Sequence, residues 1–235
     1  MLKPFFSYFG GKYRIARRYP APEHKTLVEP FAGGAGYALR YYDRDVVLIE
    51  KYPTLAAVWR YLIEVRPDEI RRLPLLEPLE SVDDKIWPCE EAKHLVGLWV
   101  HRANTRPAKT HTPMIRRYWD LKPGSRWSER SRDRIASQVD KIRHWRVIEG
   151  GYEDAPDITA TWFVDPPYEV AGKSYVYGSK ALDYSSLSEW CRRRRGLTIV
   201  CENMGATWLP FTELCSAKAM RKGKPSAEAV WINRQ

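Results

Sequence analysis

Short apolar runs alternate with amphipathic segments in the first 66 residues. The runs at 26–31 and 46–50 are the length of buried strands, and 53–66 has apolar residues at helical spacing with a proline at either end. A glycine-rich stretch follows the first run, and we expect a helix after Gly36. The order strand, helix, strand, helix is typical of a doubly wound sheet.

The same kind of pattern returns near residue 146. A capping-box spacing joins Ser186 to Glu189, and Gly196 stands where that helix would stop. The elements predicted in this part are strands at 145–152, 159–168, 197–203 and 227–235 and a helix at 185–196.

The segment between these parts has a different character. Strand alternation disappears over 67–146, and proline, tryptophan and arginine become frequent. Helices are predicted at 90–105 and 128–145, with a loop between them that carries a turn at 122–124. We therefore expect an α/β protein whose doubly wound, Rossmann-like sheet is built from 1–66 and 147–235. A mainly helical domain, residues 67–146, would be inserted between its halves.

The positive charge is concentrated in that insert. The chain of 235 residues has a formal charge of +10. Residues 102–146 hold 13 lysines and arginines against 4 acids, whereas the rest holds 26 against 25. Such a local excess is the electrostatic footprint of phosphate binding, although a basic surface without a partner is the alternative. The residues expected to contact DNA are Arg102, Arg106, Lys109, Arg116, Arg117, Lys122, Arg126, Arg130 and Arg132.

The composition argues against several classes of protein. There is no run of about 18 apolar residues, so a membrane span is not expected, and no signal-peptide core precedes Gly10. The four cysteines are scattered without a C-x-x-C pair, which makes zinc and disulfide readings weak and favours a reducing cytosol. We expect no metal.

The glycine-rich stretch EPFAGGAG, residues 29–36, suits a ligand turn. Glycines permit a tight turn and close backbone approach, and backbone N–H groups at a helix start favour anions. Glu50 follows Gly33 by 17 residues, the usual spacing of an acid that binds ribose hydroxyls. NAD, a nucleotide or S-adenosylmethionine would all fit, as would a purely structural turn. A P-loop would need Gly-Lys-Ser/Thr, which is missing here.

The stretch TWFVDPPY, residues 161–168, ends a buried strand abruptly. Prolines lack the N–H group that a central strand needs for pairing, so the strand must end in a rigid turn. In open α/β sheets, ligands bind at this end of the strands. Asp165 and the carbonyl of Pro166 offer two acceptors for an amine on a heteroaromatic ring, and Tyr168 offers a face to stack on it. The alternative is a surface turn with a packed tyrosine.

Three stretches together resemble a known family. YFGGK (8–12), LVEPFAGGAGYAL (27–39) and TWFVDPPY (161–168) are similar to motifs of the Dam-type, D12-class DNA adenine-N6 methyltransferases. Their order is also the family's own, with cofactor motifs first, then a target-recognition insert, then the catalytic motif. The resemblance covers most of the chain.

The resemblance implies roles for individual residues. The target amine would be bound by Asp165 and Pro166, and its base would stack on Tyr168. Two positions depart from the family: the ribose acid is more often Asp than Glu, and Ser7 stands where some members have a DNA-touching lysine. The implied ligands of S-adenosylmethionine are Tyr8, Lys12, Glu29, Phe31, Ala32, Gly33, Gly34, Gly36, Glu50, Tyr152 and Asp165.

The expected activity is methyl transfer to the N6 amino group of a flipped-out adenine in double-stranded DNA. We expect a monomer or weak dimer in a bacterial cytoplasm, with a phage or other mobile element as one source. The alternatives are methylation of RNA or of a protein glutamine amide, and a DNA-binding module of the same fold without activity. An oxidoreductase with a dinucleotide in the glycine turn would leave DPPY and YFGGK unexplained.

Overall fold

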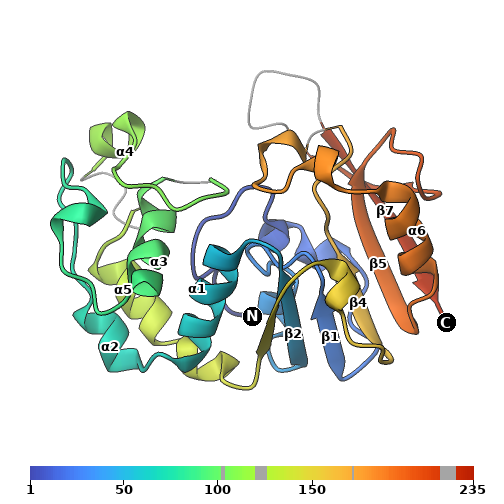
Figure 1. The fold of residues 1–235 in the computed structure, drawn as a ribbon, viewed down its shortest axis with the longest axis horizontal. Helices are drawn as coiled ribbons and strands as arrows, with labels where there is room; N and C mark the ends of the chain where they lie inside the picture. The colour runs from blue at the N-terminus through green and yellow to red at the C-terminus, as the bar shows by residue number, and fades with distance from the viewer. Residues whose placement is uncertain (102–103, 120–125, 171, 218–225) are drawn as a thin grey trace.

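Seven strands form one mixed sheet in the computed structural model, which describes residues 1–101, 104–119, 126–170, 172–217 and 226–235 (Figure 1). The strand order is β3-β2-β1-β4-β5-β7-β6; the first five strands in this order are parallel, and β7 is antiparallel to both β5 and β6. The strands are β1 Thr26–Glu29, β2 Asp45–Glu50, β3 Arg146–Glu149, β4 Ala160–Val164, β5 Gly196–Asn203, β6 Thr212–Ala217 and β7 Ser226–Arg234.

The α/β class is thus confirmed, and the order of the parallel strands is compatible with a doubly wound sheet, whose order reverses between β1 and β4. Apolar residues of successive strand positions point to opposite faces. Leu27 and Leu48 join one buried cluster, with α1, and Val28 and Ile49 join another, with α6. The helices are α1 Pro53–Glu64, α2 Pro67–Arg72, α3 Glu90–Val100, α4 Pro113–Arg117, α5 Glu129–Ala136 and α6 Tyr184–Arg192.

Several expected helices are wrong in detail. After Gly36 the chain makes only a 3-10 turn, Ala38–Tyr41, because β2 already starts at residue 45. The helix expected over 128–145 stops at Ala136, where Gln138 instead exchanges two hydrogen bonds with the backbone of Lys3 (2.7 and 3.2 Å).

Other boundaries also differ from the prediction. The N-cap of α6 is Asp183, which accepts from the N–H groups of Ser185 and Ser186, rather than a capping box from Ser186. The expected loop contains α4, capped by Thr112, and its turn at 122–124 lies outside the described residues. Strand β6 was not predicted, because TELCSA has no clear alternation and becomes a strand by pairing with β7.

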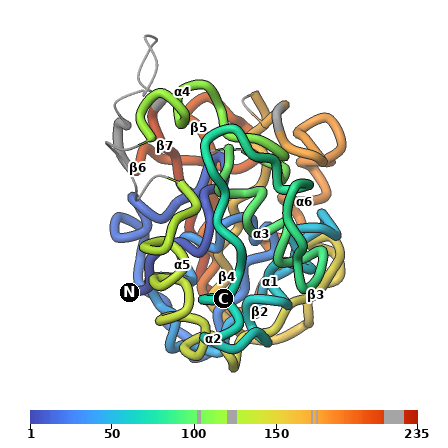
Figure 2. The backbone as a smooth tube through the Cα atoms, turned by 90° about the vertical axis from the view of Figure 1, so that its left-hand side faces the viewer, coloured from blue at the N-terminus to red at the C-terminus, as the bar shows by residue number. Residues whose placement is uncertain are grey.

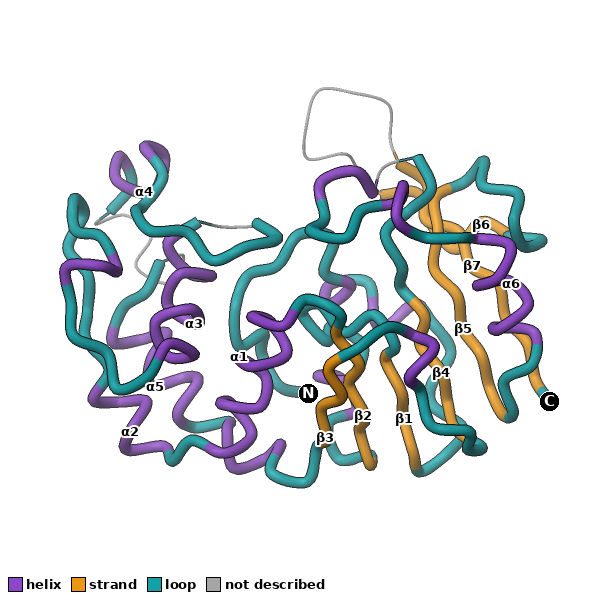
Figure 3. Tube along the Cα trace, viewed as in Figure 1, coloured by secondary structure: helices purple, strands orange, loops and turns teal. Residues whose placement is uncertain are grey.

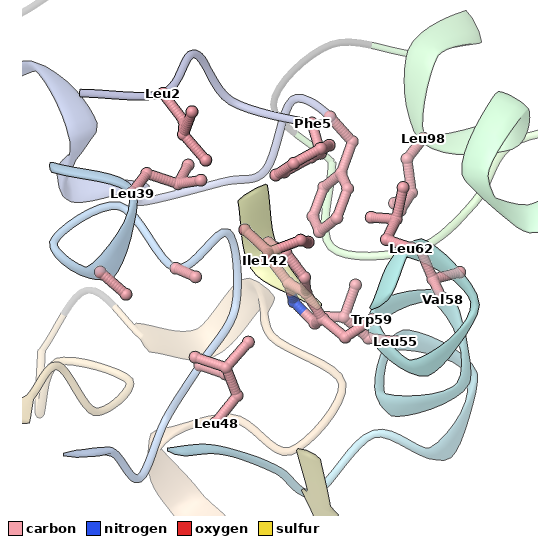
Figure 4. Packing of buried hydrophobic residues seen from close by; sticks show 14 of the residues in the cluster. Leu2, Phe5, Leu39, Leu48, Leu55, Val58, Trp59, Leu62, Leu98 and Ile142 are labelled. Atoms are coloured by element: carbon pink, nitrogen blue, oxygen red, sulfur yellow. The ribbon is translucent and has the colours of Figure 1, made fainter. Parts of the chain in front are cut away.

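Residues 67–145 lie beside α1, away from most of the sheet (Figures 1 and 3). Figure 2 views this side, with α3 and α5 in front of the strands. The described residues here form helices and loops, apart from one bridge between Ser81 and Thr110. They share a single apolar cluster with the sheet: Leu98 and Ile142 gather around Trp59 with Phe5 (Figure 4).

The N-terminal segment 2–9 ties the two parts together. The indole N–H of Trp99 in α3 donates to the carbonyl of Phe5 (2.9 Å), and the Arg134 guanidinium of α5 donates to Pro4 (3.1 Å). On the other side, the N–H of Leu2 donates to the carbonyl of Leu39 (2.9 Å). Within the described ranges, no helix is long and apolar enough to cross a membrane.

Candidate functional site

A cavity of about 300 Å³ lies at the carboxyl ends of β1, β2 and β4. Glu29 and Glu50 are the last residues of β1 and β2, and Asp165 follows β4 directly. This is the point where the strand order reverses, the usual ligand position in open α/β sheets. All eleven residues predicted to hold the cofactor line this cavity: Tyr8, Lys12, Glu29, Phe31, Ala32, Gly33, Gly34, Gly36, Glu50, Tyr152 and Asp165.

The glycine turn is fixed by side chains from the next two elements. The N–H of Gly33 donates to Glu50 Oε2 (2.9 Å), and the indole of Trp59 in α1 donates to the Gly33 carbonyl (2.9 Å). Gly33 has a φ of +46°, and a Cβ there would lie 3.1 Å from the ring of Tyr8. This residue must therefore be small and able to adopt a left-handed conformation.

The YFGGK motif is pressed against the same turn. A Cβ at Gly36 would lie 2.5 Å from the backbone nitrogen of Tyr13, so only glycine allows this approach. Two motifs that are separate in the sequence, at 8–12 and 29–36, therefore share one wall of the cavity.

Two backbone N–H groups in and just after the glycine turn are already occupied by side chains. The N–H of Ala38, which opens the short 3-10 turn, donates to Glu29 Oε1 (2.5 Å), and Glu50 accepts from both Gly33 and Tyr52 (2.9 Å each). The protein's own carboxylates thus occupy donors that a pyrophosphate would need.

The cavity lining is acidic although the protein is basic. It includes five carboxyl groups, those of Glu29, Glu50, Glu153, Asp165 and Asp183, and two ammonium groups, those of Lys12 and Lys51. Burial raises the pKa of Glu29 to about 8 despite its backbone hydrogen bonds, and burial also raises the pKa of Glu50. A positively charged ligand would relieve the crowding of these acids, and an anionic ligand would worsen it.

Asp165 is paired with Lys12. The Lys12 ammonium lies 2.7 Å from Asp165 Oδ1 and also donates to the carbonyl of Gly10 (3.1 Å). Burial raises the pKa of Asp165 to about 6, with Lys12 opposing this effect and Glu228 adding to it. Burial by itself would lower the pKa of Lys12, but Asp165 and Glu228 raise it above its ordinary value. At neutral pH the cavity therefore holds a mostly ionised, oriented aspartate.

The other two residues of the DPPY motif are placed differently from Asp165. Pro166 is buried, and neither it nor Tyr168 lines the cavity, whereas Pro167 does. The ring of Tyr168 lies 4.6 Å from the Lys12 ammonium, and its hydroxyl donates to Glu228 Oε1. The structure thus brings Tyr168 next to the Lys12–Asp165 pair, with its ring in contact with a cation.

Several residues that sequence reasoning missed belong to this region. Glu228, in β7, accepts from Tyr168 and from the Tyr19 hydroxyl (2.7 Å). The loop before α6 covers the cavity with two aromatic residues, Tyr175 and Tyr177. Alternating tyrosines in SYVYG and an Asp-Tyr-Ser-Ser helix start were available signals for that loop, but no motif marks Glu228.

Two predicted cofactor residues pack on each other. The rings of Phe31 and Tyr152 are stacked with centroids 5.8 Å apart, and Tyr152 makes an edge contact with Trp190 of α6 (5.3 Å). Both line the cavity, so its aromatic wall is built from the glycine turn and from the loop after β3.

The predicted DNA-binding cations fall into three groups. Arg106, Arg117 and Arg130 are exposed, and Arg116 is half-buried. Three others have structural contacts: Lys109 with Asp83 (2.6 Å), Arg126 with the Trp119 ring (4.0 Å) and Arg132 with the Leu73 carbonyl (2.7 Å). Arg102 and Lys122 lie outside the described residues.

Comparison with known proteins adds no family. No protein-family model matches the chain, and no curated protein matches it.

In the part of the chain that the structure describes, no cluster of three or more His, Cys, Asp or Glu side chains could hold a metal ion. The thiols of Cys89, Cys191 and Cys201 are free.

Proposed function

We propose that the protein is an S-adenosylmethionine-dependent methyltransferase that acts on the N6 amino group of adenine in DNA. The observation that carries this proposal is the convergence of three separate motifs on one cavity that ends at Asp165. In this proposal the sheet is a methyltransferase sheet, and residues 67–146 recognise the target DNA.

The charges of the cavity support this cofactor over a dinucleotide. S-adenosylmethionine carries a positive sulfonium beside a nucleoside, and the lining contains five carboxyl groups against two lysines. Glu50 would bind the ribose in this proposal; in its support, Glu50 ends the strand beside β1 and lines the cavity. For a dinucleotide, two N–H groups in and just after the glycine turn would already be occupied by Glu29 and Glu50.

The cofactor supplies the electrophilic methyl group, and the side chains supply position. Lys12 holds Asp165 Oδ1, and the second oxygen of the same carboxylate can accept an N–H of the target amine. The Pro166 carbonyl would accept the other N–H, drawing the nitrogen toward tetrahedral geometry and freeing its lone pair. This is catalysis by orientation and electrostatics.

The target base must first leave the duplex, which costs a few kcal/mol. The two hydrogen bonds to the amine would offset part of that cost. A proton leaves after the transfer, and a carboxylate with a pKa of about 6 accepts it more readily than an ordinary aspartate.

A transfer assay tests the proposal. The purified protein is incubated with tritiated-methyl S-adenosylmethionine and with duplex DNA, RNA or protein, and the modified base is identified by mass spectrometry. Label in N6-methyladenine of DNA is the expected result. Label in RNA or in protein amides would favour those substrates, and cofactor binding without transfer would indicate an inactive module. Tighter binding of NAD than of S-adenosylmethionine would overturn the proposal.

A further inference from the structure

Glu228 reaches the candidate site from the far end of the chain. Because β7 is antiparallel to β5, its amino end lies at the carboxyl ends of the parallel strands, with Glu228 opposite Asn203. The residue is only 8% exposed. A carboxylate in such a position requires strong partners.

Its partners are the immediate neighbours of Asp165. One oxygen, Oε1, accepts from the hydroxyls of Tyr168 and Tyr19 and lies 3.8 Å from the Lys12 ammonium. Lys12 in turn lies 2.7 Å from Asp165, and Tyr168 is three residues further along the same turn. One buried ammonium is therefore shared by two carboxylates.

Removing Glu228 would release both neighbours at once. The partly buried Tyr168 hydroxyl would lose Glu228 as its acceptor, and Lys12 would lose one of its two acidic partners. The hydrogen bonds of both groups to Asp165 would then change, because Asp165 is the carboxylate that remains beside them.

We propose that Glu228 is a positioning residue, which holds Lys12 and Tyr168 so that the Asp165 carboxylate keeps its orientation toward the target amine. This inference rests on the proposed function. The titratable groups that act electrostatically with Asp165 are seven: Lys12, Glu228, Tyr168, Tyr19, Glu29, Tyr175 and Cys201.

The test compares E228A and E228Q with Y19F. The Y19F variant removes one donor to Glu228 Oε1 but keeps the carboxylate, its hydrogen bond from Tyr168 and its ion pair with Lys12. We expect kcat to fall about 10- to 100-fold in E228A, the loss of a charged hydrogen-bonding partner, with the KM for S-adenosylmethionine changed less than about threefold. We expect a smaller loss in E228Q and the smallest loss in Y19F, because Y19F keeps the carboxylate that holds Lys12 and Tyr168.

The pH profile separates positioning from folding. Glu228 raises the pKa of Asp165, so E228Q should move the acidic limb of the kcat profile to lower pH. Equal losses in E228A and Y19F, or a wild-type rate and pH profile in E228Q, would overturn the inference. Thermal melting shows whether each variant is folded. If E228A does not fold, the rate and the pH profile of E228Q alone test the inference.

A measurement without substrate keeps this inference distinct from the proposed function. Carbon NMR titration of the Asp165 carboxyl should give a lower pKa in E228Q than in the wild type. If the wild type transfers no methyl group but this pKa shift is seen, the proposed activity on DNA fails, whereas the interaction between Glu228 and Asp165 is supported. If the shift is missing, the positioning role fails whatever the activity.

Discussion

The acidic cavity and the basic segment 102–146 use charged groups in opposite ways. In the cavity the acids at the ends of the strands are largely buried and held by hydrogen bonds or an ion pair: Asp165 by Lys12, Glu29 by Ala38, Glu50 by Gly33. The segment has a larger net charge, which is positive, but some of its cationic side chains make hydrogen bonds that hold the fold together. Arg132 and Arg143 donate to carbonyls at the ends of α2 and α1. Net charge therefore shows where a polyanion is attracted, and only the contacts show which cations remain for it.

The largest expected effect concerns Asp165. We expect D165A to lower methyl transfer by about 10³-fold or more, because it removes an oriented acceptor at the reacting nitrogen. DNA affinity, measured by fluorescence anisotropy, should stay within about threefold of the wild type. Equal losses of methyl transfer and DNA affinity would show that Asp165 also contributes to DNA binding, and that the two regions do not have separate roles.

A smaller effect is expected at Glu50. We expect E50A to weaken S-adenosylmethionine binding about 10- to 100-fold in calorimetry, since it removes a charged acceptor and the support of Gly33. The control is E149Q, which changes the last residue of the adjacent strand, paired with Glu50 in register but outside the cavity. Unchanged cofactor affinity in E50A would show that the ribose is bound elsewhere.

The cations of the segment should separate into two classes. We expect the triple change R106A/R117A/R130A to reduce the slope of log affinity against log salt by about 3, roughly one for each phosphate contact. The comparison variant R132A loses its bond to Leu73 and should lower the free energy of unfolding by about 1.5–3 kcal/mol with the slope unchanged. An unchanged slope in the triple variant would place the DNA surface elsewhere.

The last prediction concerns the pH dependence of stability, and it leaves methyl transfer and DNA affinity aside. Burial raises the pKa of Glu29 from 4.5 to about 8, so the folded protein binds more protons than the unfolded chain between these values. The free energy of unfolding should therefore fall as pH rises through this window, by up to about 1.4 kcal/mol per pH unit for this one group. In E29Q, chemical denaturation between pH 5 and 8 should show a flatter dependence; an unchanged dependence would mean that Glu29 is ionised throughout.

Local patterns predicted most of the sheet and of the cavity. Strands β1, β2 and β4 are apolar runs that end at glycines or acids, and that is enough to place Glu29, Glu50 and Asp165 at one edge. Parallel neighbours bring their carboxyl ends together, so sequence spacing translates directly into a site.

The remaining features depend on long-range contacts. Gln138 ends a helix because the backbone of Lys3 is nearby, and β6 exists because β7 pairs with it. Glu228 enters the site only through an antiparallel strand from the last tenth of the chain. None of these contacts leaves a periodic signal in the sequence around the residue that makes it.

The hydrogen bonds of segment 2–9 have a consequence for protein engineering. Trp99 and Arg134 hold this segment from the helical side, and Leu2 is held from the sheet. Residues 67–145 therefore could not be exchanged alone: grafting them onto a related sheet would require the N-terminal segment of the host to be exchanged with them. Deleting the first few residues should likewise loosen both halves together.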